Sequence, residues 1–252
     1  NGGTTGRLTA TSGIVNNASL VINRSDNFTQ ATDLGVAAII SGTGSLTKTG
    51  TGVLTLAGNN TFTGATTIDQ GGITLLNSSL AATTIAQGAQ LVGIGTIRGN
   101  LTNQGLLSPG TSPGTVTVNG NYSQASTGNY LVELASASSF DRLIVNGTAQ
   151  LGGTLTITGI GSYAPAVGQS FTILNATGGV SGTFSAIDSP WTTALAMRRL
   201  NAVYNSNDVT LTYVQRAFAG LRGTANQAAV GAAVDSALAA GTVPVLVSVL
   251  NS

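Results

Sequence analysis

Cysteine and histidine are both missing from this chain of 252 residues, and their absence removes whole classes of chemistry. Without histidine there is no Ser-His-Asp or Cys-His nucleophile. Without either residue type there is no zinc or copper centre of the usual kind, no disulfide framework and no thiol redox reaction. The commonest hydrolase and metal sites are therefore excluded.

Charge is scarce as well. Charged residues are 7% of the chain, against roughly 25% in an average soluble protein, and the net charge is +1. Lys48 is the only lysine and Glu133 the only glutamate. So little net charge provides no basic surface for the phosphates of a nucleic acid, and we therefore expect no nucleic-acid partner.

The chain also lacks the segments that direct or anchor proteins. No run of about 18 apolar residues is present in its bulk, so no transmembrane helix is predicted there. Its first residues have neither the basic start nor the apolar centre of a signal peptide. We therefore expect a mature segment whose start was set by cleavage or by the choice of the expressed segment.

What the chain has is glycine, at 35 of 252 residues, and short runs of alternating apolar and polar residues. Most runs have four to six residues, are rich in β-branched types and end at Gly or Asn, which is the pattern of a β-strand. Examples are 45–50, 53–58, 73–76, 115–118, 131–134, 143–145 and 154–158. Helical periodicity is absent until residue 224.

Many short strands suit a sandwich, a barrel or a parallel β-helix. Three features favour the β-helix. The loops between the runs have only two to four residues, and the apolar residues are mostly aliphatic and able to stack on like neighbours in successive coils. Asn and Thr recur at the strand ends, where they can form ladders between coils. We predict an all-β fold, a right-handed parallel β-helix.

Aromatic residues suggest a boundary within the chain. Of the twelve aromatic residues, only Phe28 and Phe62 lie before residue 120. A terminal unit that closes the stack needs such rings, because open β-helix ends are edges that must be capped. We expect coils over 1–119 and a β-rich cap over 120–216, with a cap core of Phe171, Phe184, Trp191, Leu211 and Tyr213.

A proline- and glycine-rich segment lies near this boundary, at residues 108–114. Pro109-Gly110 and Pro113-Gly114 have the residue order of type II turns, so the sequence predicts two tight turns in tandem at a coil corner, or a binding loop.

One helix is predicted, and it comes last, within 217–252. Thr224 and Gln227 have the spacing of a capping box, with Thr at the N-cap and Gln at N3. An apolar stripe follows, and Gly241 and Pro244 end the helix. The stripe consists of Val230, Ala233, Val234, Ala237 and Leu238.

Residues 42–68 closely resemble the passenger-associated repeat of bacterial autotransporters, the proteins of type V secretion. The matching stretch contains Gly-x-Gly-x-Leu at 42–46, Leu-x-Leu-x-Gly at 54–58, Asn-Thr-Phe-Thr-Gly at 60–64 and Thr-x-Ile at 66–68. Segments 106–122, 141–155 and 168–184 are similar to the last coils and the autochaperone region of the same family. The resemblance covers roughly residues 40–240.

The resemblance implies the C-terminal part of a passenger: a right-handed β-helix, an autochaperone cap and a linker helix. It implies a partner, the chain's own translocator β-barrel in the outer membrane, which would follow Ser252 in a longer precursor and enclose the linker helix. It also implies a location at the bacterial cell surface or in the medium. Asp141-Arg142 could be a surface ion pair, a ligand site or a fixed turn, and its match to the family's Asp-x-Leu position implies a structural turn.

No enzymatic constellation is present. Asp26 and Asp33 are close enough in sequence to form a carboxylate pair, but the flanking residues offer no third partner. Calcium-binding nonapeptides are absent, because neither Gly71-Gly72 nor Gly152-Gly153 is followed by the required Asp. We expect no catalytic residue, no metal site and no cofactor in this segment. Arg198-Arg199 is read as a solvated guard on an edge strand, or as a contact with barrel loops or lipid headgroups.

The main functional hypothesis is a structural stalk and folding template that drives secretion across the outer membrane. The alternatives are an adhesin or self-association surface on the β-helix itself, with a host or bacterial surface ligand, and a carrier for an enzyme upstream of residue 1. An ice-binding surface is not favoured, because the Thr-x-Thr pairs are irregularly spaced along the sequence.

Overall fold

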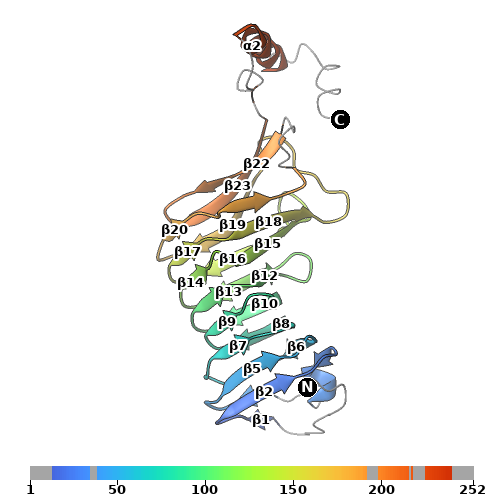
Figure 1. The fold of residues 1–252 in the computed structure, drawn as a ribbon, viewed down its shortest axis with the longest axis vertical. Helices are drawn as coiled ribbons and strands as arrows, with labels where there is room; N and C mark the ends of the chain where they lie inside the picture. The colour runs from blue at the N-terminus through green and yellow to red at the C-terminus, as the bar shows by residue number, and fades with distance from the viewer. Residues whose placement is uncertain (1–12, 35–38, 192–197, 216, 218–224, 240–252) are drawn as a thin grey trace.

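The computed structural model describes residues 13–34, 39–191, 198–215, 217 and 225–239, and its β-strands form a parallel β-helix (Figure 1). Most strands belong to two sheets. The eight-stranded sheet runs in the order β2 (Ser19–Asn23), β5 (Ser45–Thr49), β7 (Thr66–Ile68), β9 (Thr83–Ile85), β11 (Leu101–Asn103), β14 (Tyr122–Gln124), β17 (Ala149–Leu151) and β20 (Val180–Gly182). The all-β, β-helical prediction is confirmed.

The thirteen-stranded sheet forms the other walls of the helix. Its strands are β3 (Phe28–Thr29), β6 (Val53–Ala57), β8 (Gly72–Leu80), β10 (Gln90–Ile97), β12 (Leu106–Pro109), β13 (Thr115–Val118), β15 (Asn129–Leu134), β16 (Arg142–Val145), β18 (Thr154–Gly159), β19 (Ser170–Ala176), β21 (Ala186–Asp188), β22 (Arg198–Tyr204) and β23 (Asp208–Gln215). Two further strands, β1 (Ile14–Val15) and β4 (Ile40–Ser41), pair with each other.

Aliphatic side chains stack in columns through the interior, as predicted. Alternation within each strand sends every second residue inward, and the parallel register places inward residues of successive coils over one another. One such column, joined by register partners, is Phe28, Leu54, Ile73, Leu91, Leu107, Tyr130, Leu155 and Ile187. All but Ile187 are buried.

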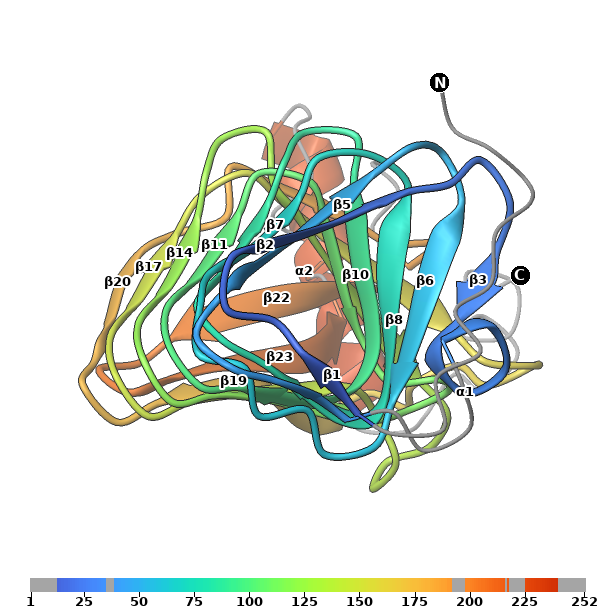
Figure 2. The same cartoon turned by 90° about the horizontal axis from the view of Figure 1, so that it is seen from below.

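The coils are shortest in the middle of the stack and widen toward the C-terminus. In the eight-stranded sheet, successive coils are marked by the register partners Leu20, Leu46, Thr66, Thr83, Leu101, Tyr122, Ala149 and Val180. The stretch of chain between neighbouring members of this row shortens as far as Thr83 and then lengthens at every step to Val180. The end-on view shows the later coils reaching beyond the earlier ones (Figure 2).

This widening accounts for the aromatic residues of the C-terminal half. The wall that is one continuous strand in β8 and β10 divides in later coils into β12 and β13, β15 and β16, and β18 and β19. Larger interior side chains fill the larger cross-section: Tyr122 and Tyr130 are fully buried within coils that still pair in parallel. The expected boundary at residue 120 therefore does not coincide with a change in strand pairing.

Strand pairing changes at β19. This strand pairs in parallel with β16 and antiparallel with β23, and β23 pairs antiparallel with β22. We call β19, β22 and β23 the cap sheet. β20 and β21, which follow β19 in the chain, still pair in parallel with the coil below, β20 with β17 and β21 with β18.

Glycine makes the tight corners between the two sheets. Gly71 and Gly153 have φ of 63° and 59°, a left-handed conformation that favours glycine. A Cβ at either position would also collide with a main-chain carbonyl of the preceding coil, that of Gly52 or Gly128. Glycine is therefore needed where the chain passes from one sheet to the other, as between β7 and β8 and between β17 and β18.

Three local predictions need correction. A four-residue helix, α1 (Gln30–Asp33), precedes the terminal helix, so the latter is not the only one. The segment 108–114 forms neither of the two predicted Pro-Gly turns: Gly110, with φ of 102°, bridges Gly93 at the end of β12, and the turn lies at 111–113, where Ser112 has φ of 96° and Gly114 has no positive φ. Pro109 itself is the last residue of β12.

The terminal helix is α2 (Ala225–Ala239), close to the predicted position. Its apolar stripe is not a buried face, since Val230 is 65% exposed and Ala233 is also exposed. Alanine and valine occur on all sides of this helix, so its apolar residues do not define one face. Gly241 and Pro244 lie outside the described residues. No helix in the described part of the chain is long and apolar enough to cross a membrane.

Candidate functional site

The centre of the cap sheet is aliphatic and aromatic. Phe171 of β19 and Leu211 of β23 are register partners, and both are fully buried. The ring of Phe171 meets that of Phe140 edge to face, with centroids 5.3 Å apart. Aromatic pairs in this geometry gain about 0.5–1.5 kcal/mol beyond their burial. The cap is thus joined to the loop before β16 in the coil below.

Phe184 joins the last coil to the cap. It is buried, and its ring centroid lies 6.4 Å from that of Tyr130 and 6.2 Å from that of Tyr204. The main-chain nitrogen of Phe184 donates to the hydroxyl of Tyr204 over 3.2 Å, and the hydroxyl of Tyr130 donates to the carbonyl of Ile173 over 2.7 Å. Rings and hydroxyls together connect β15, β19 and β22.

The remaining predicted residues of the cap core, Tyr213 and Trp191, differ in how far they are buried. Tyr213 is buried, whereas Trp191 is only partly buried and packs at the edge of the core. A Cβ added to Gly159 would lie 3.1 Å from the ring of Trp191, so the indole lies against this glycine. Thr224 and the side chain of Gln227 lie outside the described residues, so the predicted capping box stays a prediction.

One edge of the cap sheet carries the Arg198-Arg199 pair. Within the described residues β22 pairs with β23 alone and ends the order of strands in its sheet. Arg198 and Arg199 open this strand, and Arg199 is exposed. Exposed charge on an edge strand opposes pairing with another chain.

Asp141 is a buried carboxylate that ties two coils together. Its Oδ1 accepts from the main-chain nitrogen of Gly114 over 2.7 Å, and its Oδ2 accepts from that of Glu133 over 2.9 Å. Burial raises the pKa of Asp141 to about 7, although these two hydrogen bonds act to lower it. The neighbouring Arg142 guanidinium lies 4.5 Å from the centroid of the Phe140 ring. Asp141 therefore has a structural role, but through these hydrogen bonds and not in the turn that was expected.

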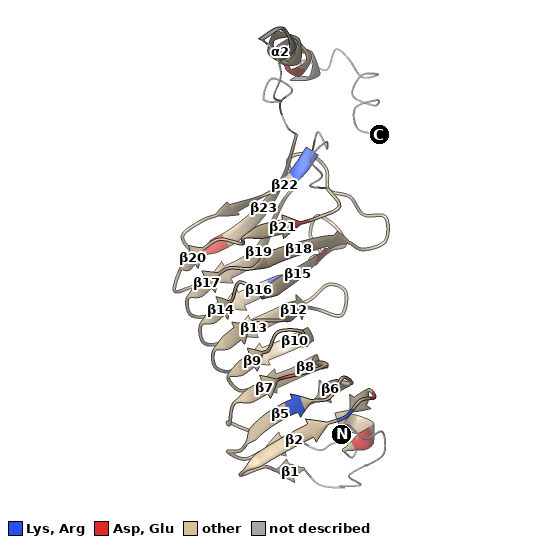
Figure 3. Cartoon of the chain, in the orientation of Figure 1, with Lys and Arg blue, Asp and Glu red and all other residues tan. Residues whose placement is uncertain are grey.

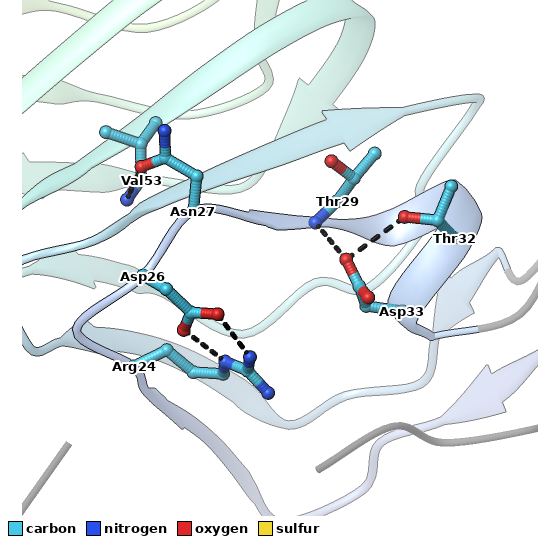
Figure 4. Close-up of polar contacts among 7 residues, drawn as sticks. All are labelled: Arg24, Asp26, Asn27, Thr29, Thr32, Asp33 and Val53. Carbon is cyan, nitrogen blue, oxygen red and sulfur yellow. Dashed lines mark hydrogen bonds and ion pairs between the residues drawn. The ribbon is translucent and has the colours of Figure 1, made fainter. Parts of the chain in front are cut away.

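Asp26 and Asp33 do not act as a carboxylate pair, as Figure 4 shows. Asp26 binds Arg24 through two contacts of 2.6 and 2.8 Å, and this hydrogen-bonded guanidinium lowers the pKa of Asp26. Asp33 accepts from the main-chain nitrogen of Thr29 and from the hydroxyl of Thr32. Each carboxylate thus fixes the local chain around α1.

Other charges are scattered singly along the stack (Figure 3). Within the described residues no group of three or more acidic side chains is placed to hold a metal ion.

A buried amide network around Asn60 was not predicted. The side chain of Asn60 exchanges hydrogen bonds with that of Gln30, at 2.8 and 3.1 Å, and its Oδ1 also accepts from the main-chain nitrogen of Ile40. Its Nδ2 donates to the hydroxyl of Ser78 over 2.9 Å. From a coil further on, Arg98 donates to the carbonyls of Asn60 and Phe62. We call these residues the Asn60 network; they join α1, β4 and β8.

A second buried network, the Tyr122 network, lies further along. The Tyr122 hydroxyl donates to Oε1 of Gln124 over 2.6 Å and accepts a long contact of 3.4 Å from Nδ2 of Asn103. Gln124 Nε2 lies within 2.9–3.1 Å of the carbonyls of Gly128, Gly152 and Thr154. Asn103 also donates to the carbonyl of Asn129. These contacts join three successive coils.

Lys48 is the third unexpected interior group. Its side chain is buried, and Nζ donates to the carbonyls of Thr49, Gly50 and Gln70 over 2.6, 2.8 and 3.3 Å. Burial lowers the pKa of this ammonium group. The only sequence signal for these three groups is a polar residue at a position that should point inward. In the sequence alone, such a residue looks the same as one that ends a strand.

The comparison with family models adds the deciding observation: residues 46–75 match the passenger-associated-transport-repeat. The chain is autotransporter passenger sequence. The matched residues run from β5 into β8 and contain Asn60 and the fully buried Phe62, so the family repeat includes the centre of the Asn60 network.

Two relatives of this passenger sequence are much longer than the chain. It is 30% identical over 208 residues to an extracellular serine protease of Serratia marcescens, covering 78% of the chain and 20% of that protein. It is 32% identical over 152 residues to the uncharacterized protein YuaQ of Escherichia coli strain K12, covering 55% of the chain and 11% of that protein. Passenger homology implies a location at the cell surface or in the medium.

Proposed function

We propose that this passenger segment is a structural stalk and a folding template that drives secretion across the outer membrane. The cap sheet folds first, and its edge then directs the pairing of each coil in turn. Folding outside the membrane biases diffusion of the chain outward, so export needs no ATP. The chain's own translocator barrel is the partner in this proposal, with α2 as the linker helix inside it.

The observation that carries this proposal is the cap sheet. At one end of the coil stack, β22 and β23 form an antiparallel hairpin on β19, and residues far apart in the sequence become fully buried there. An antiparallel hairpin forms from local contacts, whereas each parallel coil needs a preformed neighbour. A stable unit of this kind provides the edge on which β16 and earlier strands pair.

Trp191 offers a direct test in the full precursor. We expect Trp191→Ala to lower surface display and to increase the protease sensitivity of the passenger, because the indole no longer covers Gly159 at the margin of the core. Trp191→Phe, which keeps a ring there, should lose less. Val203→Ala, at a side chain 44% exposed on β22, is the control that should match wild type. Unchanged display and protease resistance in Trp191→Ala would show that Trp191 has no such role.

A second candidate function is adhesion or self-association through the eight-stranded sheet. Parallel register places Thr47, Thr67, Thr84, Thr102 and Ser123 in one outward row on successive coils. All five are partly exposed. The row supports a polar binding face, although the Thr pairs are irregular along the sequence.

The double variant Thr84→Val, Thr102→Val tests this face, because valine keeps the shape of threonine and removes the hydroxyl. If the face binds, the double variant should reduce cell aggregation by the purified protein. Thr74→Val, on the other sheet, should leave aggregation unchanged. Equal aggregation by all variants would remove this candidate.

A third role follows from the length of the relatives. The Serratia protein carries a serine protease name, and the chain matches a fifth of it. We propose that this segment itself is not catalytic and carries a separate functional part located upstream in its precursor. An enzyme there would retain its hydrolytic activity in a precursor whose Asp26, Asp33 and Asp141 are each changed to Asn, provided that the protein is exported.

A further inference from the structure

Successive corners of the stack share one sequence pattern. They connect β10 to β11, β13 to β14, β16 to β17 and β19 to β20, and each has three residues with glycine in the middle: 98–100, 119–121, 146–148 and 177–179. The first two corners end in asparagine, Asn100 and Asn121. The corners lie over one another, because the strands on both sides of them pair in parallel register.

The asparagine that ends a corner reaches across to the next coil. Oδ1 of Asn100 accepts from the main-chain nitrogen of Asn121 over 2.9 Å, and Oδ1 of Asn121 accepts from that of Thr148 over 2.9 Å. The main-chain nitrogens of Leu101 and Tyr122 in turn donate to the carbonyls of Asn121 and Thr148. The preceding coil therefore holds both the N–H and the C=O of these two residues. We call the side-chain bonds of Asn100 and Asn121 the corner clasps.

Glycine in the middle of the next corner leaves room for each clasp. A Cβ added to Gly120 would collide with Oδ1 of Asn100, and one added to Gly147 would collide with Oδ1 of Asn121. Neither glycine has a positive φ, so it is space and not backbone conformation that requires glycine at these positions. Asparagine in one coil and glycine in the next therefore form a matched pair.

Earlier coils lack the clasp at the same position. Register places Ala65 and Ala82 where the later coils have Asn100 and Asn121. Alanine offers no side-chain acceptor. In the described coils the main-chain nitrogens of Ala82 and Asn100 have no hydrogen-bond partner within the protein, and both residues are exposed. These two nitrogens are left to bind water.

We propose that Asn100 and Asn121 are positioning residues that set the register in which one coil docks on the next. Their clasps span 21 and 27 residues, so a repeat of fixed length does not specify this register. A slip by one residue would turn inward side chains outward, and the clasp forms only in the correct register. In the folding-template account the folded coil presents the donor and the incoming coil brings the asparagine. Only this order of events rests on the proposed function.

Asn121→Leu and Asn121→Asp separate the clasp from side-chain shape. Leucine and aspartate both have nearly the size of asparagine, but only aspartate keeps an acceptor for the Thr148 nitrogen. In the full chain, Asn121→Leu should lower the hydrogen-exchange protection of the Thr148 amide about three- to tenfold, whereas Asn121→Asp should retain it. NMR of the labelled chain resolves this amide.

Refolding from urea tests whether the clasp sets register or only stabilises the finished fold. If the clasp forms as the coil docks, Asn121→Leu should slow refolding about three- to tenfold and leave the unfolding rate nearly unchanged. Asn121→Asp should refold at the wild-type rate. Faster unfolding of Asn121→Leu at an unchanged refolding rate would overturn the positioning role, because the bond would then form only after docking.

Ala82→Asn and Ala65→Asn test the clasp in the opposite direction. A Cβ added to Gly99 would lie 2.9 Å from the Cβ of Ala82, so an asparagine at 82 faces the glycine that a clasp needs. An asparagine at 65 would instead face the buried Ala81, which precedes Ala82 as Gly99 precedes Asn100. Ala82→Asn should raise the protection of the Asn100 amide, and Ala65→Asn should leave that of Ala82 unchanged.

Equal effects of the two new asparagines would overturn the proposal, as would loss of Thr148 protection in Asn121→Asp as well as in Asn121→Leu. Surface display of the same variants in the full precursor separates this proposal from the folding template. Slow refolding of purified Asn121→Leu together with unchanged display would uphold the clasp and count against the template.

Discussion

Asp141 accepts a 2.7 Å hydrogen bond from the main-chain nitrogen of Gly114, in the preceding coil, while its second oxygen binds the nitrogen of Glu133. One carboxylate therefore holds the Pro-Gly segment to the end of β15. The Glu133 carboxylate, which contacts Ser112, acts to raise the pKa of Asp141, whose own charge acts to raise the pKa of Tyr130. The Arg142 guanidinium lies over Phe140.

This buried carboxyl makes stability depend on pH. Its pKa is raised from 3.8 to about 7, so between these values the folded chain holds a proton that the unfolded chain has released. The free energy of unfolding must then fall as pH rises from about 4 to about 7. The urea midpoint should be higher at pH 5 than at pH 8.

Asp141→Asn is the variant that isolates this effect. Its amide nitrogen would face one of the two main-chain donors, so the variant should be less stable at every pH, but the difference between pH 5 and pH 8 should shrink. An undiminished difference would assign the pH dependence to other groups.

Phe171 is predicted to be the most costly single truncation in the cap. Phe171→Ala removes a fully buried ring and its edge-to-face contact with Phe140, at a cost of about 3–5 kcal/mol in the free energy of unfolding. Urea unfolding followed by circular dichroism measures it. Val203→Ala should cost less than about 0.5 kcal/mol. Similar costs for the two variants would contradict the assignment of Phe171 to the core.

Lys48→Met should destabilise the chain by about 1–3 kcal/mol, because the carbonyls of Thr49, Gly50 and Gln70 lose their common donor inside the protein. Unfolding in urea again gives the value. A methionine variant as stable as wild type would mean that water or packing replaces the ammonium group at no cost. Ile68→Met, at the next position of the same interior column, controls for the change in side-chain shape.

Gly71→Ala and Gly88→Ala separate backbone strain from contact between coils. Both glycines have positive φ, at 63° and 81°, so each alanine carries a strain of about 1 kcal/mol. A Cβ at Gly88 meets open space, whereas one at Gly71 collides with the carbonyl of Gly52. Thermal unfolding should therefore show a much larger loss for Gly71→Ala. Equal losses would show that the corner relaxes without cost.

The strands could be predicted from the sequence because alternation is local. The run 115–118 is β13 as predicted, and 154–158 lies within β18, since inward and outward residues differ clearly in polarity. The cap core followed from large apolar residues such as Phe171 and Leu211, which have no other place in a neutral chain. The resemblance at 42–68 to the passenger-associated repeat added the expected order of parts: coils, then cap, then linker helix.

The interior networks could not be predicted, because the coils differ in length. Asn60 meets Gln30 across 30 residues and Ser78 across 18, and no single period relates these spacings. Trp191 was expected in the core but is only partly buried and packs against its margin. The prediction of a turn at Pro113-Gly114 was wrong: Gly114 has no positive φ, and its main-chain nitrogen donates to Asp141, which lies 27 residues further on.

The order of folding during export tests the central claim most directly. In a pulse-chase experiment on the full precursor, protease added outside the cells would report when each segment becomes resistant. The folding-template account predicts that 170–215 becomes resistant first and 14–57 last. Resistance that appears first in 14–57, or at the same time in both segments, would contradict it.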